Sequence, residues 1–131
     1  MRGSGSVHQR MSGSPVTATV TGDPLIRWCT EPLPRMAALL SHAAGAVSND
    51  SGLMHLAAAR GLRVVALFGS TAPELGFAPA GDGHTVVCRH ESCQPCTLHG
   101  RPNCPRGHFR CMQLIAPEDI ARAATAVAPT A

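Results

Sequence analysis

The strongest constraint on the fold is a run of five apolar residues, Val64 to Phe68, with no polar residue inside it. A strand with one face toward water alternates apolar and polar side chains, so this run indicates a strand buried on both faces of a parallel sheet. Parallel strands need long crossover connections, which are usually helices. The run therefore predicts an α/β fold.

Segments of suitable length and pattern flank this run. Short strands are expected at 17–20, 46–49 and 85–88, and a loop over Gly69–Pro73 should follow the buried strand. Helical spacing predicts one helix from Pro34 to Gly45, a second over Ser51–Arg60 closed by Gly61, and a third from Pro117. The first repeats apolar residues at Met36, Leu39, Leu40 and Ala43, and the third at Ile120, Ala123, Ala124 and Val127.

The chain has 131 residues, the size of one domain, and a sheet of three or four strands would be about half of a doubly wound domain. Residues 1–15 are rich in Gly and Ser and are expected to be a flexible leader or tag, without the apolar stretch of a secretory signal. Residues 16–131 should then form a partial domain in the cytoplasm. No apolar run approaches the roughly 20 residues that span a membrane.

The net charge of the chain argues against one class of function, the binding of nucleic acid. All 11 basic residues are Arg, against 8 acids, which gives a formal net charge of +3. This surplus is small and scattered, so no nucleic-acid partner is expected.

The segment Asn49-Asp50-Ser51-Gly52-Leu53-Met54-His55 joins a predicted strand to a predicted helix. Ligands of open α/β sheets bind at this edge. Asp50 is expected to cap the helix, leaving the N–H groups of Ser51, Gly52 and Leu53 free to bind a diphosphate. Gly52 would allow close approach, and His55 lies on the same helix face as Ser51. The alternative is an ordinary helix cap followed by a helix histidine.

Two longer segments carry a resemblance to a known family. SNDSGLMHLAAARGLRVVALFGSTAPELGFAP resembles the donor-binding segment of the ADP-heptose:lipopolysaccharide heptosyltransferases, glycosyltransferase family nine. CRHESCQPCTLHGRPNCPRGHFRCMQLIAPEDI resembles the Cys-Gln-Pro-Cys and Cys-Pro-x-Gly-His segments of its heptosyltransferase II branch. The resemblance covers about Leu33 to Val127.

The resemblance implies a GT-B enzyme with two facing Rossmann-like domains, of which this chain is the C-terminal half of the donor-binding domain. The parent enzyme would transfer heptose from ADP-heptose to the lipopolysaccharide inner core, without a required metal, at the inner face of the membrane. The acceptor domain and its acidic base have no counterpart here. No catalytic residue is therefore assigned, and the chain is expected to be inactive alone; the alternatives are a non-catalytic half-domain or a small zinc-stabilised binding module.

The resemblance also implies roles for residues that match its motif. Asp50 would bind sugar hydroxyls or help hold the donor, and His55 would approach phosphate or sugar. Ser70 and Thr71 would line the same crevice or only shape the loop. The diphosphate would be lined by Ser51, Gly52, Leu53 and Met54.

Six cysteines without an export signal favour thiols or metal ligands over disulfides. Cys29 and Cys88 stand alone in apolar sequence and are expected to be buried. The other four belong to a loop at 88–111, where they could bind a structural zinc ion, remain free thiols or form disulfides: Cys93, Cys96, Cys104 and Cys111. The same loop is rich in Arg and His, but the chain lacks the aromatic residues of a nucleic-acid stacking surface.

Overall fold

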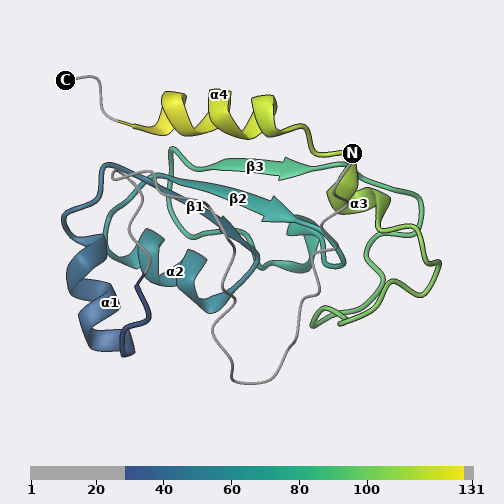
Figure 1. Cartoon of the computed structure of the whole chain (residues 1–131), viewed down its shortest axis with the longest axis horizontal. Coiled ribbons are helices and arrows are strands. Elements are labelled where there is room, and N and C mark those ends of the chain that lie inside the picture. The colour runs from purple at the N-terminus through teal and green to yellow at the C-terminus, as the bar shows by residue number, and fades with distance from the viewer. Residues whose placement is uncertain (1–28, 129–131) are drawn as a thin grey trace, which may run out of the picture.

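The centre of the molecule is a three-stranded parallel sheet, which Figure 1 shows in a computed structural model that describes residues 29–128. Its strands, in the order β1-β2-β3, are β1 (Ala46–Asn49), β2 (Val64–Phe68) and β3 (Thr85–Cys88). All three lie where the sequence predicts them. The expected leader and the expected strand at 17–20 fall outside the described residues.

Strand β2 is buried along its whole length because it has a neighbouring strand on each side and a helix on each face. Successive side chains point to opposite faces. Val64, Ala66 and Phe68 pack on one face, and Val65 and Leu67 on the other. This arrangement explains the apolar run without alternation.

Helix α2 (Gly52–Ala59) makes the crossover from β1 to β2 and covers one face of the sheet. Its Met54 and Ala57 are buried against the side chains of β2. The helix ends at Ala59, and the chain leaves it through Gly61, whose φ of +81° is a conformation that glycine adopts without strain.

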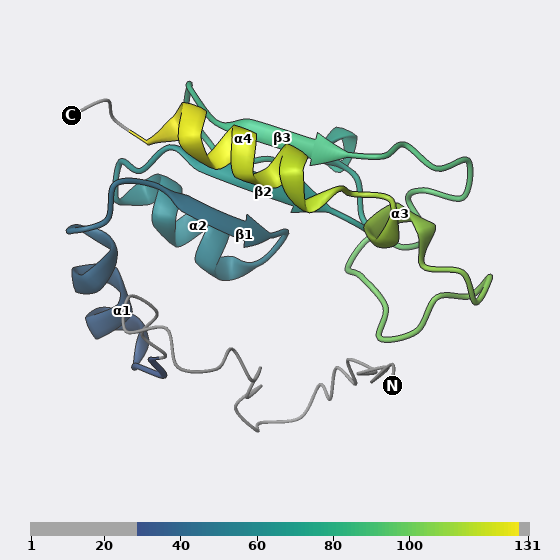
Figure 2. The same ribbon diagram turned by 45° about the horizontal axis from the view of Figure 1, so that its top comes forward.

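Helix α4 (Pro117–Val127) covers the opposite face and lies along the sheet in Figure 2. Ile120, Ala123 and Val127 pack toward Val65 and Leu67. These three residues of α4 are among those whose helical spacing predicts the apolar face, so the sequence identifies the packing face of this helix correctly.

Helix α1 (Leu33–Leu40) lies beside α2 and has no buried residue. It ends at Leu40, so the prediction that it continues past Ala43 to Gly45 is wrong. The N–H groups of His42 and Ala43 donate to carbonyl oxygens three residues back, at 3.0 and 3.1 Å, and this tighter turn ends the helix. The chain then reverses to enter β1.

Two short elements have no counterpart in the sequence prediction. A 3₁₀ turn, η1 (Pro73–Leu75), follows β2 and ends at Gly76, and helix α3 (Arg110–Gln113) lies at the end of the cysteine-rich loop. Helices this short leave no periodic pattern that a sequence window detects.

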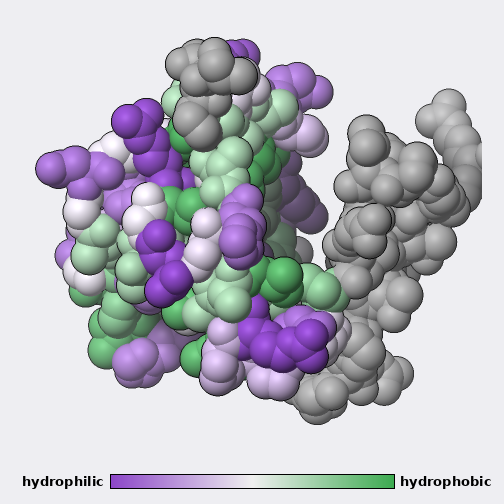
Figure 3. Space-filling model, turned by 90° about the vertical axis from the view of Figure 1, so that its left-hand side faces the viewer, coloured by the Kyte–Doolittle hydropathy of each residue, from purple (hydrophilic) through white to green (hydrophobic). Residues whose placement is uncertain are grey.

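Apolar residues also remain on the surface, including Val47 of β1 and Val86 of β3. Figure 3 shows the end of the molecule where α1 lies, with apolar areas interspersed among polar ones. No helix in the described part of the chain is long and apolar enough to cross a membrane.

Candidate functional site

Three loops meet at the carboxyl edge of the sheet. The β1–α2 turn brings Asp50, the loop after β2 brings Ser70 and Thr71, and the cysteine-rich loop (residues 88–111) follows β3. Because the strands are parallel, these loops share one edge, which is where open α/β sheets bind ligands.

Asp50 joins the first two loops. Its Oδ2 accepts a hydrogen bond of 2.6 Å from the hydroxyl of Thr71, a residue that is only 6% exposed. The prediction that Asp50 caps α2 is wrong: the N-cap is Ser51, and no side chain caps the helix. The carboxylate instead turns toward Thr71, a partner 21 residues away in the sequence.

The start of α2 leaves backbone donors free. Among residues 29–128, no protein acceptor pairs with the N–H groups of Ser51, Gly52 and Leu53. A Cβ atom added at Gly52 would meet nothing within 4 Å, so the space beside these donors is open. This geometry agrees with the sequence prediction.

Met54 is the exception in this turn. Its side chain is fully buried in the core, and its N–H donates to the carbonyl oxygen of Ser51 at 3.1 Å. The expectation that Met54 lines a diphosphate is therefore wrong, because neither its side chain nor its amide reaches the surface of the site.

Two hollows adjoin at this edge, and Asp50 and His99 line both. The first has a volume of about 270 Å³ and includes Ser70, Thr71 and Arg101 in its wall. The second has a volume of about 220 Å³ and includes Ser51, Gly52 and His55. The structure thus brings the predicted residues together, apart from Met54 and the side chain of Leu53.

The cysteine-rich loop supplies a wall that the sequence does not predict. His99 and Arg101 come from this loop and face residues of the β1–α2 turn and the loop after β2. In the sequence they are only part of a basic stretch. No local signal distinguishes them, because their position depends on how the loop folds back.

Several charges of that stretch are already paired. Arg89 contacts Asp119 at 2.8 Å, and Arg110 contacts Glu91 at 3.6 Å. Arg101 makes no ion pair with any residue of the described chain. It is therefore the cation that the hollow offers to an anionic ligand.

Gln94 fastens the loop to the edge of the sheet. Its Nε2 donates to the carbonyl oxygen of Thr71 at 3.0 Å, and its Oε1 accepts from the N–H of Glu91 at 3.0 Å. Close by, the N–H of Cys96 donates to the carbonyl oxygen of Ser70 at 2.8 Å. The sequence analysis missed Gln94, although it lies inside the Cys-Gln-Pro-Cys segment.

The pKa values of three cysteines of the loop are shifted. Burial, and then the charges of Cys93 and Cys104, raise the pKa of Cys96. Burial also raises the pKa of Cys111, and the charge of Cys96 raises it further. Backbone N–H groups, Phe109 first, lower the pKa of Cys104. Within residues 29–128, no three His, Cys, Asp or Glu side chains are arranged to hold a metal ion as they stand.

The two isolated cysteines differ. Cys88 is half-buried and packs against the core on the α2 face. Cys29 is exposed, so the expectation that it is buried is wrong. It precedes α1, a helix that itself buries no side chain.

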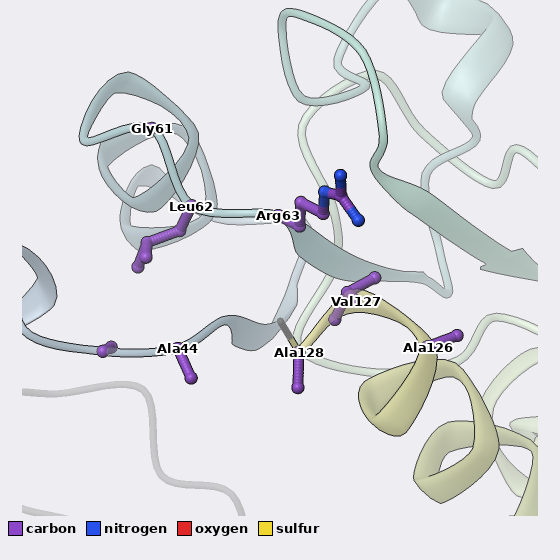
Figure 4. Close-up of a pocket in the computed structure, with 8 residues that line it drawn as sticks. Ala44, Gly61, Leu62, Arg63, Ala126, Val127 and Ala128 are labelled. Carbon is purple, nitrogen blue, oxygen red and sulfur yellow. The ribbon is translucent and has the colours of Figure 1, made fainter. Parts of the chain in front are cut away.

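A further hollow lies at the opposite edge of the sheet and has a volume of about 560 Å³ (Figure 4). Its wall consists of four alanines with Gly61, Leu62 and Val127, and Arg63 is its one charged residue among those described. None of the described residues that line it is an acid or a nucleophile. The smaller hollows at the carboxyl edge therefore form the candidate site.

Comparison with known proteins places this chain in a family. Residues 30–105 match the model of glycosyltransferase family 9 (heptosyltransferase). The chain is also 32% identical over 74 residues to lipooligosaccharide heptosyltransferase 2 of Campylobacter jejuni, and the match covers 56% of this chain but 22% of that protein. No solved structure matches the chain. Because the family match includes β1, α2, β2 and most of the cysteine-rich loop, the chain belongs to glycosyltransferase family 9, the heptosyltransferase family.

Proposed function

We propose that this chain is part of the donor-binding domain of a GT-B glycosyltransferase and that its carboxyl edge holds the diphosphate of ADP-heptose. The observation that carries the proposal is the set of three free amides at the start of α2, which open onto hollows with Arg101 and His99 in their walls. A diphosphate needs several hydrogen-bond donors close together. This edge would supply them from the start of α2 and from the cysteine-rich loop.

The electrostatics favour an anion at this position. The first amides of a helix carry a partial positive charge, and each favourable contact contributes about 0.3–1 kcal/mol at an exposed site. Arg101 adds a full charge and a planar guanidinium that can bind two phosphate oxygens. His55 lines the same hollow as Ser51 and can donate a further hydrogen bond.

Asp50 has a different role in this proposal, because its carboxylate would repel a phosphate. The Thr71 hydroxyl donates a hydrogen bond to Oδ2 of Asp50. The other carboxylate oxygen can still accept hydrogen bonds from sugar hydroxyls. Asp50 would therefore orient the heptose ring while the free amides hold the diphosphate. Ser70 and Thr71 complete the wall.

The acceptor and the transfer step are proposed from the relative. Its name describes heptose transfer to lipooligosaccharide, and we extend this to a lipopolysaccharide inner core as the acceptor. The match covers 22% of the relative's length, so the whole reaction would need parts corresponding to the rest of that protein. No described residue is assigned as the catalytic base.

Titration followed by nuclear magnetic resonance tests donor binding directly, because it detects millimolar affinity. Addition of ADP, and separately of ADP-heptose, should shift the amide signals of Ser51, Gly52 and Leu53. Signals of Arg63 and Ala126, which line the hollow at the opposite edge, should stay unchanged. Absence of shifts at saturating ligand, or shifts confined to the opposite edge, would contradict the proposal.

Arg101→Ala is predicted to weaken ADP binding about tenfold, since it removes the cation of the hollow. A tenfold change corresponds to about 1.4 kcal/mol. Arg106→Ala is the matched control, because Arg106 belongs to the same loop and is exposed but lines neither hollow. Equal loss in both variants would mean that general positive charge, and not the position of Arg101, attracts the nucleotide.

A further inference from the structure

The second hollow at the carboxyl edge, of about 220 Å³, contains apolar side chains that have no part in the proposed diphosphate contacts. Phe77 comes from the segment that follows η1, and Leu98 and His99 come from the cysteine-rich loop. Asp50 and the start of α2 complete the lining. The hollow therefore combines aromatic side chains with a carboxylate, and it adjoins the free amides of α2.

Phe77 is held in place by the core. It is half-buried and packs against the cluster on the α2 face of the sheet, which includes Met54 and Phe68. The part of its side chain that the core leaves uncovered lies in the wall of the second hollow. The aromatic ring thus has a defined position before any ligand binds.

The cysteine-rich loop brings His99 to Phe77. The two ring centroids are 6.5 Å apart and the ring planes are inclined by 47°, which is within the range of paired aromatic rings. Beside His99, a Cβ atom added at Gly100 would lie 3.5 Å from Oγ of Ser70, so the loop backbone is close to the loop after β2. The N–H of Cys96 also donates to the carbonyl oxygen of Ser70. Phe77 and His99 therefore form one aromatic wall from two separate loops.

We propose that this aromatic wall binds the apolar face of the sugar ring of the donor, an inference that rests on the proposed donor site. The C–H groups of a pyranose carry a small positive charge, and the face of an aromatic ring is negative. The hydroxyl groups of the same sugar need acceptors, and Asp50 supplies a carboxylate oxygen in the same hollow. A few polar groups among apolar and aromatic ones are typical of a small-molecule site.

The sugar suits this hollow better than the nucleobase of the same donor. An ionised carboxylate only accepts hydrogen bonds, and heptose carries several hydroxyl donors whereas adenine carries one amino group. Heptose is also bonded directly to the diphosphate, while the ribose separates adenine from it. The hollow adjoins the amides that are proposed to hold the diphosphate, so the sugar is within reach of Phe77 and His99.

Titration of the full 131-residue chain with ADP and with ADP-heptose, followed by nuclear magnetic resonance, separates the sugar from the nucleotide. Both ligands should shift the amide signals of Ser51, Gly52 and Leu53. Only ADP-heptose should shift the ring signals of Phe77 and His99. ADP-heptose should bind about fivefold more tightly than ADP, which is the size of effect expected from one aromatic contact.

Replacement of His99 tests the wall without disturbing the core, because His99 is exposed. In His99→Ala the ratio of the affinities for ADP-heptose and ADP should fall from about fivefold to near one. His90→Ala is the matched control, since His90 is an exposed histidine of the same loop that lines neither hollow. This control should keep the wild-type ratio.

Replacement of Phe77 tests the second ring. Phe77→Leu fills most of the space against the core but lacks an aromatic face, so it should lower the ratio as His99→Ala does. Phe109→Leu makes the same change in a phenylalanine that lines the first hollow and not the second, and it should keep the ratio. If Phe77→Leu does not fold, His99→Ala and the ring signals of the wild type still decide the matter.

The outcomes separate this inference from the proposed function. Amide shifts at 51–53 without ring shifts at Phe77 and His99 on addition of ADP-heptose would overturn the inference alone. Ring shifts of the same size with ADP, or a wild-type ratio in His99→Ala, would also overturn it and leave the diphosphate site standing. Absence of amide shifts with either ligand would overturn the proposed function and this inference together.

Discussion

Gly52 is a position of the site at which ligand binding and stability can be tested separately. It is the first residue of α2, and a Cβ atom there would enter open space. The same open space is where the proposed diphosphate would lie. A methyl group at this position should thus affect the ligand and leave the fold intact.

Gly52→Ala is therefore predicted to weaken ADP binding severalfold while thermal stability stays the same or rises. Replacing glycine by alanine in a helix contributes up to about 1 kcal/mol. Ala59→Gly, at the exposed last residue of the same helix, is the control and should lower stability without changing ADP binding. Thermal unfolding and the amide titration measure the two effects, and a loss of both stability and binding in Gly52→Ala would contradict this assignment.

The hydrogen bond between Thr71 and Asp50 is the direct link between the two loops of the site. Thr71→Val keeps the shape of the side chain and removes the donor, so the half-buried Asp50 carboxylate loses a partner. The free energy of unfolding should fall by about 1–3 kcal/mol. Thr71→Ser keeps the hydroxyl and should retain most of the stability in denaturant titrations; an equal loss in both variants would show that the methyl group, and not the bond, matters.

At the scale of elements, sequence patterns predict the strands well and the helix ends less well. The bounds of β1, β2 and β3 agree with expectation because apolar runs and glycine or proline boundaries are local. The end of α1 was predicted too late, since spacing alone suggested that Ala43 continued the helix. The tighter turn at His42 depends on where the chain must enter the sheet.

Replacement of Gln94 tests how the cysteine-rich loop is held to the sheet. Gln94→Ala removes hydrogen bonds to Thr71 and Glu91 and leaves a carbonyl oxygen and an amide without their partner. The predicted cost is about 2 kcal/mol, and the amide of Cys96 should exchange faster with solvent because its bond to Ser70 opens with the loop.

Gln113→Ala is the control for this prediction, because Gln113 is exposed at the end of α3. It should change neither the stability nor the exchange rate at Cys96. Hydrogen exchange measured by mass spectrometry distinguishes the two variants. Unchanged exchange at Cys96 in Gln94→Ala would mean that other contacts of the loop suffice.

At the scale of the whole molecule, we expect the chain to offer one side of the proposed donor site. The match to the relative covers 22% of that protein's length, and apolar residues such as Val47 and Val86 remain at the surface of the sheet. A ligand bound here stays open to water, so its hydrogen bonds compete with those of solvent. Tight binding would need further walls.

The isolated 131-residue chain is accordingly predicted to bind ADP-heptose with millimolar or weaker affinity and to transfer no heptose. Millimolar affinity corresponds to about 4 kcal/mol. Calorimetric titration and an assay of transfer to a lipopolysaccharide acceptor measure the two properties. Micromolar binding, or any turnover, would show that the chain is a functional unit by itself.

The sequence alone determined the α/β class, the three strands, the packing face of α4 and the position of the β1–α2 turn. These features depend on residues that are neighbours along the chain, so periodicity and turn residues are enough to reveal them. Only the tertiary structure decided that Asp50 bonds Thr71, that Gln94 fastens the loop and that Arg101 faces the turn. Those contacts join segments about 20 to 50 residues apart, and their geometry exists only after the sheet has brought its carboxyl ends together.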